Sequence, residues 1–161
     1  MKRYLPIGFV VLGLAGCSKA TPEPAPKPTP YTVSWTAEAG EITTQSYLTG
    51  TGSGRPAVTV RVGGRVYSSG TITTDIQMEV PPAVGTYTFG PSSPAWATYQ
   101  AGSPKYYAGV APGIAAAVGS GSITVTEFTG HSISGTFSFT AVDPNSGATK
   151  TISNGKFYVP E

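Results

Sequence analysis

Apolar and polar residues alternate with a period of two along much of the chain, which is the pattern of a β-strand with one buried face. The clearest run is Thr71–Val80. One of its faces is apolar (Ile72, Ile76, Met78 and Val80), and the other is polar (Thr71, Thr73, Asp75, Gln77 and Glu79). A second run, Ser132–Val142, turns Ile133, Phe137, Phe139 and Ala141 inward and Ser138 outward. Both runs predict half-buried antiparallel strands.

Shorter runs rich in β-branched and aromatic residues predict the remaining strands. They cover residues 31–37, 43–48, 58–62, 65–69, 86–90, 96–100, 105–110 and 121–128, and a last strand lies near the C-terminus. Gly63 and Gly64 form a two-residue hairpin signal, because both can adopt positive φ. Apolar parity changes at Asn154 and Gly155 in the last strand, which predicts a β-bulge. We therefore expect about nine or ten strands.

Composition agrees with this pattern. The 161 residues include 21 Gly and 15 Pro, which interrupt long helices and supply turns. Residues 31–161 are enough for one domain with its own core. The predicted fold is all-β, a single antiparallel, mainly up-and-down domain that forms either a sandwich or a partly closed barrel.

The N-terminal residues 1–16 have the organisation of an export signal. Lys2 and Arg3 precede an apolar stretch, residues 5–15, that is shorter than a membrane-spanning helix. The stretch ends in Leu14-Ala15-Gly16-Cys17, which resembles the lipobox of bacterial lipoproteins. That resemblance implies cleavage before Cys17 and lipidation of its sulfur, whereas the alternative is an ordinary signal peptide. Cys17 is the only cysteine, so the mature domain is expected to fold without disulfides.

Residues 17–30 are predicted to be a lipidated cysteine followed by a proline-rich tether. Five prolines occupy alternate positions from Pro22 to Pro30, which favours an extended polyproline conformation. At about 3.1 Å per residue such a tether reaches roughly 35 to 40 Å. The alternative is a ligand for proline-binding modules. Ser18 stands where the sorting pattern of some Gram-negative lipoproteins has the Asp of inner-membrane retention, so the expected location is the outer membrane.

Three segments of the C-terminal third carry a family resemblance: Gly119–Phe128, Ile133–Ala141 and Ile152–Phe157. With Gly85-Thr86-Tyr87 upstream, they resemble a family of uncharacterised lipoproteins of Bacteroidota. The resemblance implies an all-β fold in the cell envelope. It implies no activity, because the family has none established.

Candidate catalytic groups are few. His131, the only histidine, falls in a predicted turn without a neighbouring carboxylate, so an exposed turn residue is favoured over a general base. Asp75 and Glu79 share a strand face about 13 Å apart, farther than the carboxylates of glycoside hydrolases, and are expected to be solvated. A pair of acids assembled across strands, from Glu38, Glu41 and Glu127, stays open.

Metal and cofactor sites are not predicted. One histidine and a lipidated cysteine cannot form a zinc site. Asp143, Asn145 and Gly147 resemble the start of a calcium loop, but no later acid follows, and an Asx-type turn explains them. The expected cofactor set is therefore empty.

One aromatic cluster is a candidate binding site. Trp96, Tyr99, Tyr106 and Tyr107 lie close together in the sequence, and exposed rings of this kind stack on sugars or peptides. The alternative is that these rings fill the core.

The predicted function is a membrane-anchored, non-enzymatic binding or accessory module of the envelope, with a carbohydrate, peptide or protein partner. The nearly balanced charge, 10 basic and 8 acidic residues, argues against nucleic acid. A lipocalin-like carrier of a small apolar ligand is the alternative, and a carboxylate-dependent hydrolase is a third possibility.

Overall fold

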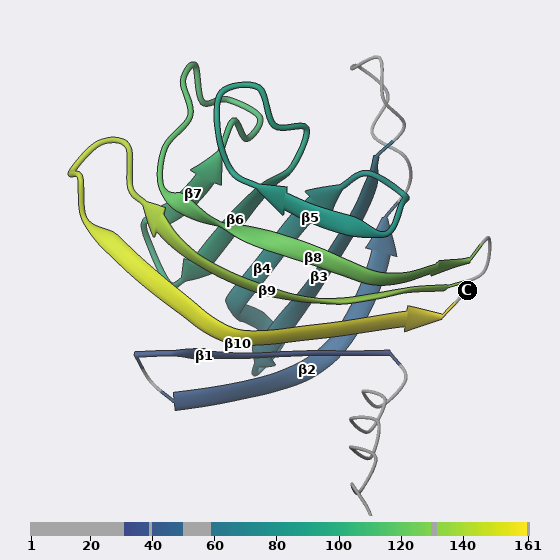
Figure 1. The fold of residues 1–161 in the computed structure, drawn as a ribbon. Coiled ribbons are helices and arrows are strands. Elements are labelled where there is room, and N and C mark those ends of the chain that lie inside the picture. The colour runs from purple at the N-terminus through teal and green to yellow at the C-terminus, as the bar shows by residue number, and fades with distance from the viewer. Residues whose placement is uncertain (1–30, 39, 50–58, 130–131, 161) are drawn as a thin grey trace, which may run out of the picture.

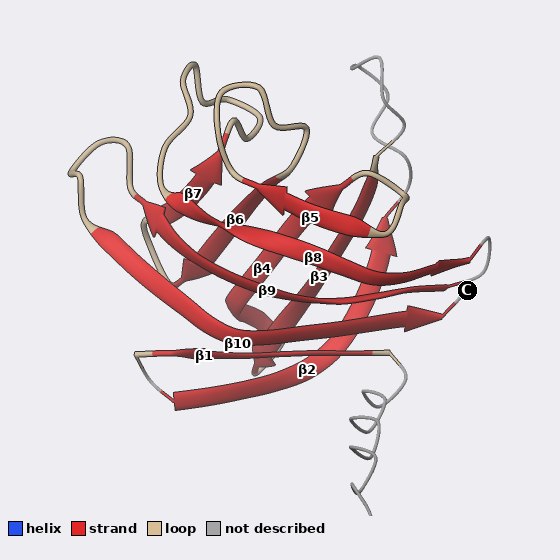
Figure 2. Ribbon diagram, in the orientation of Figure 1, coloured by secondary structure: helices blue, strands red, loops and turns tan. Residues whose placement is uncertain are grey.

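The computed structural model describes residues 31–38, 40–49, 59–129 and 132–160, and within them it contains strands and no helix (Figures 1 and 2). None of the described residues forms a helix long and apolar enough to span a membrane. Ten strands are described: β1 (Thr32–Ala37), β2 (Gly40–Thr49), β3 (Val60–Ser68), β4 (Thr71–Val80), β5 (Gly85–Thr88), β6 (Trp96–Ala101), β7 (Lys105–Gly109), β8 (Ser120–Thr129), β9 (Ser132–Val142) and β10 (Thr149–Pro160).

All strand pairings are antiparallel, and the sheet closes on itself. The order β10-β1-β2-β3-β4-β6-β7-β9 returns to β10 through a long β9–β10 ladder, which makes an eight-stranded barrel. The seam between β7 and β9 is short, with the single pair Tyr107 and Val142. Strands β8 and β5 extend the sheet beyond β9. Figure 1 shows β8, β9 and β10 crossing in front of β3, β4 and β6. Of the two predicted shapes, the barrel is therefore correct.

The interior of the barrel is packed with large side chains. The bulkiest fully buried residues come from six strands and include Trp35, Ile76, Met78, Ile123, Phe139, Ile152 and Phe157. Four phenylalanine rings form a row of contacts in the order Phe89, Phe139, Phe137 and Phe157. The centroids of neighbouring rings are 5.8 to 6.4 Å apart. Burial of these apolar groups is the main source of stability in a chain without disulfides in its core.

Gly63 and Gly64 do not form the predicted hairpin turn, because β3 runs straight through them. A Cβ atom on Gly63 would lie 2.6 Å from the Tyr47 ring, and one on Gly64 would lie 2.1 Å from Val33. Both glycines therefore serve close packing across the sheet. The turn is made instead by Ser69 and Gly70, both of which have positive φ (49° and 80°), as a tight hairpin requires.

Several sequence predictions are confirmed. Strands β4 and β9 have the predicted bounds, and β10 has the predicted bulge, with a register shift between Ile152 and Gly155. The prediction that Ile72 is buried is wrong. This side chain is 44% exposed, because it lies at the tip of the β3–β4 hairpin, beyond a register shift in that ladder. The predicted export signal (1–16) and tether (17–30) lie outside the described residues.

Candidate functional site

An open groove of about 570 Å³ lies on the barrel wall between β2 and β3. The two strands pair only from Ser46–Gly64 to Thr49–Arg61. Upstream of Ser46, β2 pairs with β1, and downstream of Gly64, β3 pairs with β4. The groove occupies the place where the β2–β3 ladder would continue. Its walls are Thr43, Thr44, Gln45, Ser46, Tyr47, Arg65, Val66 and Tyr67.

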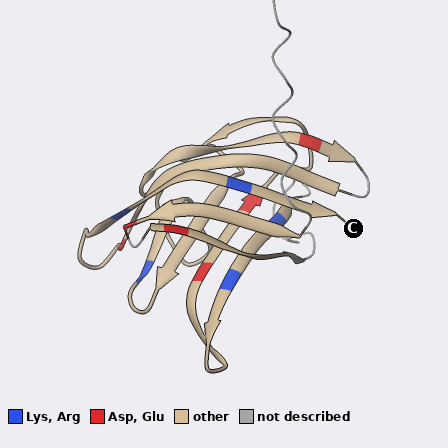
Figure 3. Cartoon of the chain, turned by 90° about the horizontal axis from the view of Figure 1, so that it is seen from below, with Lys and Arg blue, Asp and Glu red and all other residues tan. Residues whose placement is uncertain are grey.

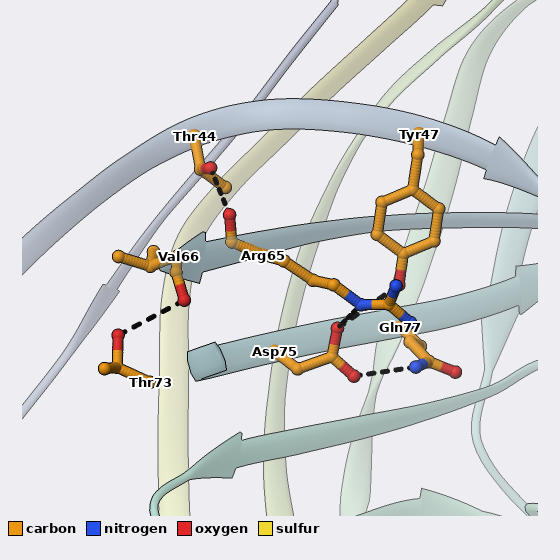
Figure 4. Close-up of polar contacts among 7 residues, drawn as sticks. All are labelled: Thr44, Tyr47, Arg65, Val66, Thr73, Asp75 and Gln77. Carbon is orange, nitrogen blue, oxygen red and sulfur yellow. Dashed lines mark hydrogen bonds and ion pairs between the residues drawn. The ribbon is translucent and has the colours of Figure 1, made fainter. Parts of the chain in front are cut away.

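A carboxylate with three hydrogen-bond donors lies beside this groove (Figure 4). Asp75 Oδ1 accepts hydrogen bonds from Arg65 Nε at 3.0 Å and from the Tyr47 hydroxyl at 3.2 Å. Asp75 Oδ2 accepts one from Gln77 Nε2 at 2.7 Å. We call these four residues the Asp75 cluster. Its members come from β2, β3 and β4, so it ties three neighbouring strands together on the outer face of the barrel.

Strand register brings the cluster together. Arg65 and Asp75 are directly opposite in the β3–β4 ladder, and Tyr47 is opposite Gly63 in the β2–β3 ladder. Because Gly63 has no side chain, the end of the Tyr47 ring lies next to Gly63 and its hydroxyl reaches Asp75 on β4. The Arg65 guanidinium carbon lies 4.8 Å from the centre of the Tyr47 ring, a cation–π contact.

Electrostatics follow from this geometry. Burial, with the negative charge of Asp75, raises the pKa of Tyr47 to about 12, so the phenol stays protonated and donates to Asp75 at neutral pH. Burial opposes the charge of Arg65, but the hydrogen bond to Asp75 and the neighbouring Tyr47 and Asp75 groups together outweigh burial and raise the pKa of the guanidinium. The positive and negative charges therefore neutralise each other within the cluster.

A second ion pair lies on the same face. Arg61 Nη2 is 2.9 Å from Glu79 Oε2, and the Thr59 hydroxyl donates to Glu79 Oε1 at 2.5 Å. The prediction that Asp75 and Glu79 are solvated is wrong, because both are only 7% exposed. Cross-strand arginines compensate their buried charges. Charged residues elsewhere on the described strands do not gather in a patch of one sign (Figure 3).

The four aromatic residues predicted as a cluster are divided between the two faces of the sheet. Tyr99 and Tyr106 are opposite each other in the β6–β7 ladder and belong to the core, and burial raises the pKa of Tyr99. Trp96 is on the outer face, 4% exposed, with the Arg61 guanidinium 5.1 Å from its ring centre. Tyr107 is half-buried opposite Thr98. Alternation within two paired strands separates these rings, so they do not form one exposed surface.

The remaining candidate acids are not brought together. Glu38 forms an ion pair with Lys150, Glu41 is opposite Thr36 and Glu127 is opposite Ser134. Among the described residues, no group of three or more His, Cys, Asp or Glu side chains is arranged to hold a metal ion. His131 and Cys17 lie outside the described residues.

Asp143 forms the Asx-type turn that the sequence predicted. Its carboxylate accepts hydrogen bonds from the Ser146 hydroxyl and from the backbone N–H of Asn145. These hydrogen bonds lower the pKa of Asp143. The residues that resembled a calcium loop therefore close the β9–β10 hairpin.

A second open groove, of about 510 Å³, crosses the outer face of β8, β9 and β10. Hydroxyl side chains line most of it, together with Lys156 and with Asn154, which has positive φ (53°) at the β10 bulge. It has no ion pair comparable to the Asp75 cluster among the described residues.

Sequence reasoning missed the groove between β2 and β3, although one signal was present. Arg61 and Arg65 have the same four-residue spacing as Asp75 and Glu79. A turn centred on Ser69 and Gly70 sets each arginine opposite one acid, as the structure shows. Placing the turn at Gly63 and Gly64 concealed this match.

A comparison with protein families adds the remaining observation. Residues 58–160 match the model of a domain of unknown function, DUF6252. The chain belongs to this family. The matched residues include strands β3 to β10, whereas β1 and β2 precede the match. No curated protein and no solved structure matches the chain. Membership in a family of unknown function agrees with the coarser part of the sequence prediction, that the chain belongs to an uncharacterised family.

Proposed function

We propose that this DUF6252 domain is a non-enzymatic binding module and that its ligand occupies the groove between β2 and β3. The observation that carries the proposal is the groove itself. Its volume of about 570 Å³ is within the range of ligand sites, roughly 300 to 1,000 Å³, and hydroxyl, amide and phenol groups line it.

The chemistry of the site supports binding rather than catalysis. Asp75 accepts hydrogen bonds from three neighbouring side chains and forms an ion pair with Arg65, so both of its carboxylate oxygens are already engaged within the protein. Glu79 is engaged in the same way by Thr59 and Arg61.

The packed interior of the barrel also supports a ligand site on the outside. Trp35, Phe139 and Phe157 are at most 2% exposed and occupy the space that a lipocalin-like carrier would use for its ligand. The ligand is therefore expected in the surface groove and not in the barrel interior.

The proposal includes placement in the cell envelope. Lipidation of Cys17, expected from the lipobox-like sequence, would anchor the chain, and the tether of residues 17–30 would hold the barrel away from the lipid surface. A module held in this way meets envelope polymers or partner proteins.

The test is an NMR titration of the full ¹⁵N-labelled chain in detergent micelles, with neutral oligosaccharides and unstructured peptides as separate probes. At least one probe class is expected to shift the amides of residues 43–47 and 65–67. Thr43→Trp, at an exposed position in the groove wall, should abolish these shifts.

Thr136→Trp is the matched control, since Thr136 is also exposed and lines the second groove. Shifts that persist in Thr43→Trp and disappear in Thr136→Trp would place the ligand in the second groove and contradict the proposal. Absence of shifts with both probe classes would also contradict it.

A further inference from the structure

The groove between β2 and β3 has two unpaired strand edges in matching register. The existing ladder pairs Ser46 with Gly64 and Tyr47 with Gly63. Continued by the same rule, it would set Gln45 opposite Arg65 and Thr43 opposite Tyr67, but neither pair forms. Three consecutive positions on each strand therefore lose their ladder partners at the groove.

Each of these edges is held straight from its other side. Thr43 pairs with Ser34 and Gln45 with Thr32 on β1, while Arg65 pairs with Asp75 on β4. The backbone at the groove is thus already in a strand conformation, so a chain that pairs with it meets a preorganised template.

One hydrogen bond shows how the native chain satisfies a backbone carbonyl on the free edge of β3. The Thr44 hydroxyl donates to the backbone carbonyl of Arg65 at 2.6 Å. In a continuous ladder that carbonyl would accept a backbone N–H from the neighbouring strand. A side-chain hydroxyl therefore replaces the ladder bond, and an incoming N–H can replace the hydroxyl.

Side chains suited to an extended peptide surround the edge. Tyr67 is 58% exposed and lies opposite Ile72, which is 44% exposed, so the hairpin presents an apolar pair next to the groove. The Tyr47 ring lies at the other end of the groove wall. Alternate side chains of an added strand would contact these groups while its backbone pairs with β3.

We propose that the groove binds an extended peptide segment of a partner protein by β-strand addition to the free edge of β3 at Arg65–Tyr67. This inference names the ligand class of the proposed binding function and rests on it. The occupant pairs through its backbone and runs antiparallel to β3. About three of its residues enter the groove, because three positions are unpaired on each side.

The experiment starts from a displayed library of random decapeptides, selected on the full chain in detergent micelles. Selected peptides are synthesised and methylated at one backbone nitrogen at a time. Strand addition predicts an alternating result: methylation at every second residue weakens binding at least tenfold, because those N–H groups face β3, and methylation at the residues between changes it less than threefold.

Two variants locate the binding edge. Thr43→Trp should remove binding of the selected peptides, and Tyr67→Ala should weaken it about tenfold through loss of an exposed ring. Thr136→Trp should leave it unchanged. Circular dichroism melts of all three variants show whether the barrel is intact, since the positions are exposed.

The other outcomes overturn the inference and separate it from the proposed function. Peptides that bind the groove with no alternating effect of N-methylation would show side-chain recognition without strand addition, and the binding function would stand. Oligosaccharide binding in the groove with no peptide selected would likewise reject strand addition and leave the binding function in place. Self-association that Thr43→Trp abolishes would identify a second copy as the occupant. Absence of every ligand would remove both proposals.

Discussion

Arg65 and Asp75 are directly opposite each other in the β3–β4 ladder, and the Arg65 Nε atom donates to Asp75 Oδ1 at 3.0 Å. The Asp75 side chain is 9% exposed, whereas that of Arg65 is 37% exposed. The carboxylate is thus largely removed from water, and its stability depends on the donors around it. This pair anchors the wall of the groove.

Asp75→Ala is expected to lower the free energy of unfolding by about 2 to 3 kcal/mol, because Arg65, Tyr47 and Gln77 all lose their acceptor. Asp75→Asn and Arg65→Gln, combined in a double-mutant cycle by urea denaturation, should give a coupling energy of about 1 kcal/mol. Additive effects of the two substitutions would mean that the ion pair contributes nothing measurable.

Alkaline pH should weaken the fold through Tyr47. Its folded-state pKa of about 12 is above the ordinary value of 10.0, so its contribution is complete below pH 10 and is lost as the pH rises toward 12. The rise of the Tyr47 pKa from 10.0 to about 12 corresponds to ~2.7 kcal/mol of folding stability. Solvent screening at this partly exposed ring reduces that to about 1 kcal/mol.

The measurement is urea denaturation of the native chain and of Tyr47→Phe at pH 9, 10 and 11. The stability difference between the two chains should be constant up to pH 10 and should fall above it. An unchanged difference at pH 11 would exclude a raised pKa at Tyr47.

Gly135 allows β9 to pack closely against its neighbours. A Cβ atom there would lie 2.1 Å from the backbone oxygen of Thr124 and 2.6 Å from the Phe157 ring. Gly135→Ala should therefore cost about 1 to 3 kcal/mol. Gly90→Ala is the control, since a Cβ at Gly90 meets nothing within 4 Å, and it should change stability by less than about 0.5 kcal/mol. Equal thermal melts for the two variants would contradict this packing.

Tyr106 and Tyr107 should respond differently to removal of their rings. Tyr106 belongs to the core, so Tyr106→Ala should cost about 3 to 5 kcal/mol. Tyr107 is only half-buried, on the outer face, and Tyr107→Ala should cost about 1 kcal/mol. Chemical denaturation monitored by circular dichroism measures both. Similar losses would mean that the two faces of β7 are assigned incorrectly.

Cys17→Ser tests the anchor. The variant should remain uncleaved or unlipidated and should no longer partition into the detergent phase, because lipidation of Cys17 is the expected means of attachment. Fractionation of the native chain and the variant, each after a salt wash, provides the measurement. Retention of the variant with lipid would show that the lipobox-like sequence does not act as one.

The sequence by itself determined the local structure of this protein. Alternation in Thr71–Val80 and Ser132–Val142 is enough to define β4 and β9, and a change of parity near Asn154 locates the bulge in β10. These features depend on residues next to one another in the chain, whose side-chain directions follow from the strand period.

Only the tertiary structure decided which strands lie side by side and where they part. Periodicity shows that Arg65 and Asp75 each occupy a strand, but their contact depends on the register of a hairpin whose turn was predicted at the wrong glycines. The split between Tyr99 and Tyr107 depends in the same way on which face meets the core. The groove arises because β2 follows β1 and β3 follows β4 once the barrel closes, and closure is set by packing among residues distant in sequence.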